Sequence, residues 1–169
     1  PSLGEHNPDA WAASDVVGGS PGVAEPANAN PYRTVVINEF LAHTDPPDFD
    51  FIELYNYSTA AVDLSGCFLS DDATTNKFVI PPGTTIPPQG IVYFSETQLG
   101  FALNAAGETI YFKRPDNRQV LDAVRFGAQE NGVSMGHFPD GAPGFYRLQT
   151  KTPGTKNGTL RLSPVVINE

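Results

Sequence analysis

The sequence has little cysteine, little positive charge and no long hydrophobic run. Cys67 is the single cysteine in 169 residues, so an internal disulfide is excluded and a hydrophobic core must hold the fold. Lysine and arginine number 10 against 19 aspartate and glutamate residues, which gives a formal net charge of −9. A phosphate backbone would be repelled by this charge, so no nucleic-acid partner is expected. We also expect no membrane span, because no apolar run is long enough to form one.

What the sequence does contain indicates short strands joined by turns. Glycine and proline number 16 each without a period, and 40% of the residues are hydrophobic, enough for one all-β domain with a core. Only residues 96–106 could hold a helical turn. The expected strands lie within 34–42, 49–58, 66–71, 77–96 (two strands), 108–114, 119–127, 134–138 and 144–150. The spacing is typical of a β-sandwich of about seven to nine short strands.

The two ends of the chain differ from this central domain, which we place at residues 34–158. Residues 1–33 hold no lasting apolar pattern and are interpreted as a linker or the end of a preceding unit. The pentapeptide Val35–Glu39 recurs letter for letter as Val165–Glu169, and a Pro-Gly pair recurs nearly in phase with it. This predicts tandem units of about 130 residues, in which 159–169 form a linker and the first strand of a following repeat. We expect this second copy either to lie along an exposed sheet edge by strand addition or to extend as a tail.

The strand segments occur in the order and at the spacing of a known family. VVINEF, an acidic loop, DFIELYN and VDLSGCFLSDD are followed by FVIPPGTTIPPQGIVYF, GFALNAAGETIYF, VLDAVRFG, NGVSMGHFPDG and a final TPG. Over about residues 34–157 the chain resembles the lamin-tail domain family, bacterial type. The resemblance implies an immunoglobulin-like β-sandwich in a secreted or cell-surface bacterial protein, where such domains accompany hydrolases or adhesive modules. Similar sequences often carry tryptophan at the position of Cys67.

One motif suggests catalysis. Residues 132–136 match G-x-S-x-G, with Ser134 at the position of a hydrolase nucleophile. That motif works on a turn between a strand and a helix, whereas here Pro139 and Gly141 follow within a few residues and no helical pattern is present. A strand edge followed by a turn explains the residues better. Cys67 lies in an apolar strand and is interpreted as a small hydrophobic residue.

The acidic loop at residues 43–50 suggests a metal site. Asp45, Asp48 and Asp50 bring three carboxylates together, with Glu53 next on the strand, and calcium prefers several oxygen ligands from a flexible loop. The spacing is not that of an EF-hand, and a Pro-Pro pair stiffens the loop. A solvated loop that keeps one end of the sheet soluble is the alternative. The three histidines lie far apart without metal-ligand spacing, so no cofactor is expected.

Alternating aromatic residues mark the second expected strand. Phe49, Phe51, Tyr55 and Tyr57 fall on one face, opposite Ile52 and Leu54. Such a stripe is either core or a binding surface, and for Phe51 and Tyr55 the core interpretation is favoured.

Together these features predict a non-catalytic sandwich module of a larger secreted or surface protein. It would space or tether neighbouring domains of the same chain, or bind a protein or glycan. The alternative is a hydrolase that uses Ser134 or a metal-assisted acidic loop.

Overall fold

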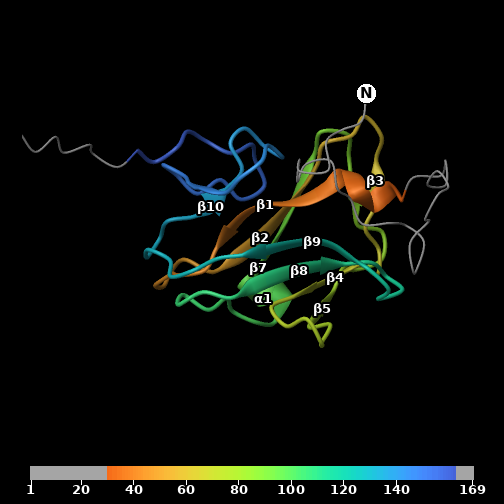
Figure 1. The fold of residues 1–169 in the computed structure, drawn as a ribbon, viewed down its shortest axis with the longest axis horizontal. Helices are drawn as coiled ribbons and strands as arrows, with labels where there is room; N and C mark the ends of the chain where they lie inside the picture. The colour runs from red at the N-terminus through yellow and green to blue at the C-terminus, as the bar shows by residue number, and fades with distance from the viewer. Residues whose placement is uncertain (1–29, 163–169) are drawn as a thin grey trace, which may run out of the picture.

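The computed structural model describes residues 30–162, in which antiparallel strands form two main sheets and one small one (Figure 1). The first sheet has the order β11-β10-β1-β2-β7, and its strands are β1 (Val35–Leu41), β2 (Phe51–Asn56), β7 (Ile91–Ser95), β10 (Met135–Gly136) and β11 (Tyr146–Arg147). The second sheet has the order β5-β4-β8-β9, with β4 (Phe68–Ser70), β5 (Phe78–Val79), β8 (Thr109–Lys113) and β9 (Val120–Arg125). The small sheet pairs β3 (Val62–Asp63) with β6 (Thr85–Ile86).

The all-β prediction is confirmed, with differences in detail. The last four expected strands are present as β8, β9, β10 and β11, which pair antiparallel as β8–β9 and β10–β11, and α1 (Glu96–Leu99) lies in the segment expected to hold a helical turn. Residues 30–162 contain more strands than expected, because β3 was not predicted and 77–96 holds three strands rather than two. The additional strands are only two residues long, too short to show an alternating pattern. Most of the predicted N-terminal linker and the repeated pentapeptide Val165–Glu169 lie outside the described residues.

The main core lies between the two large sheets. Ile37, Ile52 and Leu54 from the first sheet belong to one buried cluster with Leu69 and Phe112 from the second, and all five are 0% exposed. Burial of each such side chain contributes about 1.5–3 kcal/mol. Cys67 belongs to the same cluster as a free thiol, and burial raises its pKa to about 12, as expected of a small buried hydrophobic residue.

The outer face of β1 and β2 is covered as well. All six residues of β2 are buried, although Phe51, Glu53 and Tyr55 point away from the main core. Their cover is residues 137–158, which we call the C-terminal strap. A Cβ atom at Gly141 would lie 3.1 Å from the Tyr55 ring, which shows how closely the strap follows this face. Phe51 and Tyr55 are therefore buried as predicted, but in a second layer rather than in the main core.

Gly136 leaves room for the strap to pack closely against β1. A Cβ atom there would lie 2.6 Å from the side-chain nitrogen of Asn157 and 3.0 Å from the Asn38 carbonyl oxygen, so a larger residue would push the strap away. Beyond the strap, Gln149 donates to the Thr159 carbonyl and Arg161 donates to the Arg147 carbonyl. The hydrogen bonds of this unit therefore extend a few residues past 158.

The two ends of the described chain lie at opposite ends of the longest axis, which is horizontal in Figure 1. The first turn, η2 (Pro31–Thr34), begins at one end, capped by the side chain of Asn30. The last described residues follow β11 at the other end. Within residues 30–162 no helix is long and apolar enough to cross a membrane.

Candidate functional site

The most unusual site in the described structure is a pair of buried glutamates beneath the strap. Glu39 of β1 and Glu53 of β2 are directly opposite each other in the antiparallel register, and both are 0% exposed. None of the ion pairs found within residues 30–162 involves either of them. Burying a carboxylate without a cation is costly, so its oxygens need several hydrogen-bond donors or a proton.

A β-bulge in β1 builds this site. The register with β2 shifts between Ile37 and Glu39, so the extra residue Asn38 has no partner on β2. Ile37 and Phe40 face the core on either side of the bulge, while the side chains of Asn38 and Glu39 both bond to groups on the outer face. In a regular strand, successive residues would point to opposite faces. The bulge therefore places an amide and a carboxyl side by side.

Glu53 is held by one donor from β1 and one from the strap. The Asn38 amide donates to one carboxyl oxygen at 2.9 Å, and the Gly154 backbone N–H donates to the other at 2.8 Å. Burial raises the pKa of Glu53 to about 8, and the nearby carboxyls of Glu39 and Asp140 add to the rise, while the two donors oppose it. Glu53 is therefore protonated at neutral pH.

Glu39 is held by Thr152. The Thr152 backbone N–H donates to both carboxyl oxygens, at 3.0 and 3.2 Å, and its hydroxyl donates to one of them at 2.7 Å. Burial raises the pKa of Glu39. The nearby Ser134 hydroxyl and the hydrogen bonds from Thr152 lower it. Both glutamates thus accept hydrogen bonds from the strap, Glu39 from the N–H and hydroxyl of Thr152 and Glu53 from the Gly154 N–H.

Asp140 and Asn157 close the network from the strap side. Asp140 accepts from the Asn38 amide and from the Asn157 backbone N–H, both at 2.9 Å. The Asn157 amide donates to the carbonyls of Asn38 and His137, and the Gly141 N–H donates to the Asn38 side-chain oxygen. The strap is therefore tied to the β1 bulge at both of its ends.

Ser134 does not have the surroundings of a hydrolase nucleophile. Its side chain is 1% exposed, and its hydroxyl meets no partner in hydrogen-bonding geometry, although it lies near the Glu39 carboxyl. Of the histidines that the structure describes, His43 bonds to the Gln129 carbonyl and His137 to the Gly144 carbonyl. Ser134 is thus placed beside an acid but has no histidine as a base.

The acidic loop does not gather its carboxylates. Asp45 accepts from Asn131, Asp48 pairs with Lys151, and Asp50 is buried with bonds from the Thr44 hydroxyl and the Leu103 N–H. Burial raises the pKa of Asp50. Among residues 30–162 no three side chains of His, Cys, Asp or Glu are placed to hold a metal ion. The arrangement gives the predicted calcium site no ligand set.

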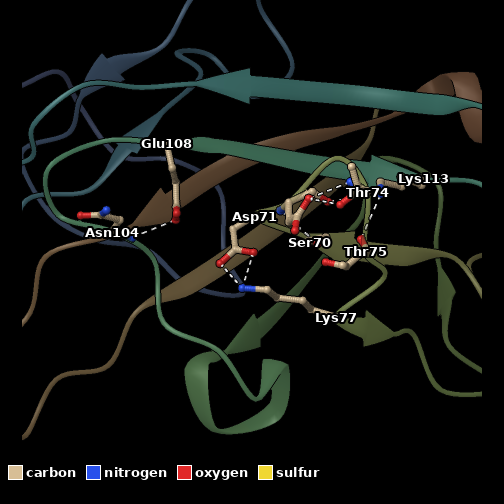
Figure 2. A network of polar contacts seen from close by, with 9 residues as sticks. Ser70, Asp71, Thr74, Thr75, Lys77, Asn104, Glu108 and Lys113 are labelled. Carbon is tan, nitrogen blue, oxygen red and sulfur yellow. Dashed lines mark hydrogen bonds and ion pairs between the residues drawn. The ribbon is translucent and has the colours of Figure 1, made fainter.

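A second polar network contains a buried cation (Figure 2). The Lys113 side chain on β8 is 3% exposed, and its ammonium donates to the carbonyls of Asp72, Ala73 and Thr75 at 2.8–3.3 Å and to the Asn76 side chain. The loop 71–76 thus wraps around one ammonium group. Next to it, the exposed ammonium of Lys77 pairs with Asp71 at 2.6 Å.

Comparison with known proteins identifies the domain. The family described as Lamin Tail Domain matches residues 28–128.

The chain belongs to the lamin-tail domain family.

The lamin-tail domain is an immunoglobulin-like β-sandwich, so the predicted family and fold class are confirmed. A search of curated proteins and a search of solved structures both return no match. The family match includes β1 to β9 and ends before β10, β11 and the strap. Glu39 and Glu53 therefore lie in the matched part of the lamin-tail domain, whereas the strap residues that bind them lie beyond it.

The sequence analysis missed this network, although one signal was present. In VINEF and in FIELY a glutamate stands inside an apolar strand, and a charged residue there must face either solvent or a buried partner. The strap donates to the two glutamates mostly through backbone N–H groups, and these groups cannot be recognised from the amino-acid types.

We predict that Glu53 makes the lamin-tail domain less stable as pH rises. The pKa of Glu53 is about 8 in the folded state, whereas the ordinary value is 4.5. Between these two pH values the folded state holds a proton that unfolding releases. This contribution to stability is fully present below pH 4.5 and is lost as pH rises to about 8, at about 1.4 kcal/mol per pH unit. Glu53→Gln should flatten the dependence, measured by urea unfolding across this range. The control Glu130→Gln, at an exposed position, should retain the wild-type slope; equal slopes in all three proteins would contradict the assignment.

We also predict that Lys113 is structural. Lys113→Met should lower the free energy of unfolding by roughly 1–3 kcal/mol, because the part-buried carbonyls of loop 71–76 would lose their donor. Lys77→Met removes an ion pair whose ammonium is exposed and should cost less than about 1 kcal/mol. Denaturant midpoints of the two variants measure the difference. An equal loss for both would show that the loop 71–76 does not depend on the ammonium.

Proposed function

We propose that this lamin-tail domain is a non-catalytic spacer that holds neighbouring domains of its chain at a set separation. The observation that carries the proposal is the position of the two ends. The described chain enters at one end of the sandwich, at η2, and leaves at the other, after β11 (Figure 1). A rigid unit with ends so placed separates whatever precedes it from whatever follows it.

The strap supports this proposal because it determines where the chain leaves. Residues 137–158 are tied to β1 and β2 by Asn38, Glu39 and Glu53. In the exit segment, Leu160 bridges to Leu148 and the Arg161 N–H donates to the carbonyl of Arg147 in β11. A strap held only by water-exposed contacts would let the exit point move over the surface. The buried network is therefore suited to transmitting a defined direction to the next domain.

The setting that we propose is the exterior of a bacterium, as the lamin-tail resemblance implies. An acidic surface with few basic groups suits a solvated spacer and opposes binding to nucleic acid. Cys67 is buried, so the domain needs no reducing compartment to keep its single thiol from reacting. The hydrolase alternative has no comparable support, because Ser134 is buried and no hydrogen bond within residues 30–162 joins it to a histidine.

Distance measurements test the spacer function directly. Spin labels on Pro31→Cys and Thr159→Cys mark the two ends at exposed positions, and the buried Cys67 should not take up label. We expect one narrow distance distribution at pH 6, because the strap holds the exit segment in place. The matched variant Thr152→Val, which loses a hydroxyl bond to Glu39, should broaden it. A broad distribution in the unmodified domain would overturn the spacer proposal.

A further inference from the structure

An open groove of about 640 Å³ runs beside the free edge of β9. One wall consists of six consecutive residues of the chain, Asp122 to Gly127. The other wall includes Val36 and Phe40 of β1 and Phe145 of the strap. Because β9 is the last strand of its sheet, this wall is a strand edge rather than a row of side chains.

Hydrogen bonding along β9 shows which backbone groups face the groove. Phe126 donates its N–H to Glu108, so by antiparallel alternation Val124 also bonds to β8, whereas Ala123 and Arg125 point outward. The Ala123 N–H is taken by the side chain of Asp122. Within residues 30–162 no strand pairs with the outward N–H and C=O of Arg125 or with the C=O of Ala123. These are the groups that an added strand would use.

The groove is closed at one end and open at the other. At the closed end, one carboxyl oxygen of Asp122 accepts the Ala123 N–H and its second oxygen accepts the Ile37 N–H at 2.8 Å, which joins β9 to β1. Further along, β1 pairs with β10 only at Glu39 and Phe40, and no strand fills the space beside Arg125. An incoming strand therefore has room along Ala123–Gly127 and not beyond Asp122.

The groove offers an apolar floor and one permanent positive charge. Phe40 packs against Phe126 at 4.5 Å and against Phe145 at 5.7 Å between ring centroids, and His137 stacks on Phe145 at 4.1 Å. Arg125, which is exposed, is the one lysine or arginine among the described residues of its lining. An extended segment with β-branched side chains and a carboxylate matches this surface.

We propose that the groove receives the segment Val165–Glu169 of a neighbouring unit as an added strand on β9. The same five residues form most of β1 here, so the sequence is already known to adopt a strand in this fold. Its valines and isoleucine suit the aromatic floor, and Glu169 complements Arg125. The inference rests on the proposed spacer function, since it supposes neighbouring units. It requires that this copy of the pentapeptide pairs with β9 of the preceding unit instead of serving as the first strand of the following one.

Paramagnetic broadening between copies of the full 169-residue chain tests the proposal. A chain of natural isotope abundance that carries a spin label at Ser163→Cys, which leaves Val165–Glu169 unchanged, is mixed at about 1 mM with a ¹⁵N chain that carries no spin label. We expect broadening of the Ala123–Gly127 amides of the ¹⁵N chain. Arg125→Glu in the ¹⁵N chain, or Ile167→Asp in the spin-labelled chain, should weaken the apparent affinity obtained from the broadening at least tenfold. The control Arg118→Glu, a matched charge reversal at an exposed turn, should leave that affinity unchanged.

Two results would overturn the proposal. One is the absence of any broadening at Ala123–Gly127. The other is broadening centred on β2 and β10, which would show that the second copy exchanges with β1 instead of adding to β9. Failure here is separable from failure of the spacer function, because the distance between the labelled ends is a property of a single unit. A narrow end-to-end distribution without intermolecular broadening would retain the spacer and remove only this contact.

Discussion

The structure depends on two buried glutamates that have no cation. Glu39 and Glu53 face each other on β1 and β2, and the donors that satisfy them come from Asn38 and from backbone groups of the strap. Removing the strap would leave two carboxyls on an open sheet face beside Phe51 and Tyr55. The sheet and the strap therefore stabilise each other, and a bulge of one residue at Asn38 makes the arrangement possible.

This mutual dependence links the fold to the proposed function. The strap covers the second face of the first sheet, leads the chain to its exit beside β11 and supplies Phe145 to the wall of the groove along β9. One segment thus sets both the direction in which the chain continues and the shape of the surface that we propose for contact between units. The family match ends at residue 128, before this segment.

Much of the fold could be predicted from pattern, and most of the site could not. Alternation and turn residues located β1, β2, β8 and β9, because these strands are long enough to show a period. The missed strands are two residues long and have no alternation to detect, and the cover of the Phe51 and Tyr55 face of β2 comes from residues about a hundred positions away. The acidic loop looked like a ligand cluster, but Asp50 turns inward to cap a backbone N–H while Asp45 and Asp48 bond elsewhere. Such choices depend on tertiary contacts that local sequence does not encode.

Amide hydrogen exchange of the strap measures the central claim most directly. The N–H groups of Thr152 and Gly154 donate to the buried glutamates, and that of Asn157 donates to Asp140. If the glutamates hold the strap, the protection factors of these three amides, corrected for intrinsic exchange, should fall together as pH rises toward 8 and the Glu53 proton is lost. Amides of β8 in the opposite sheet should fall less. Strap protection that is independent of pH, or that changes no more than in β8, would contradict the account.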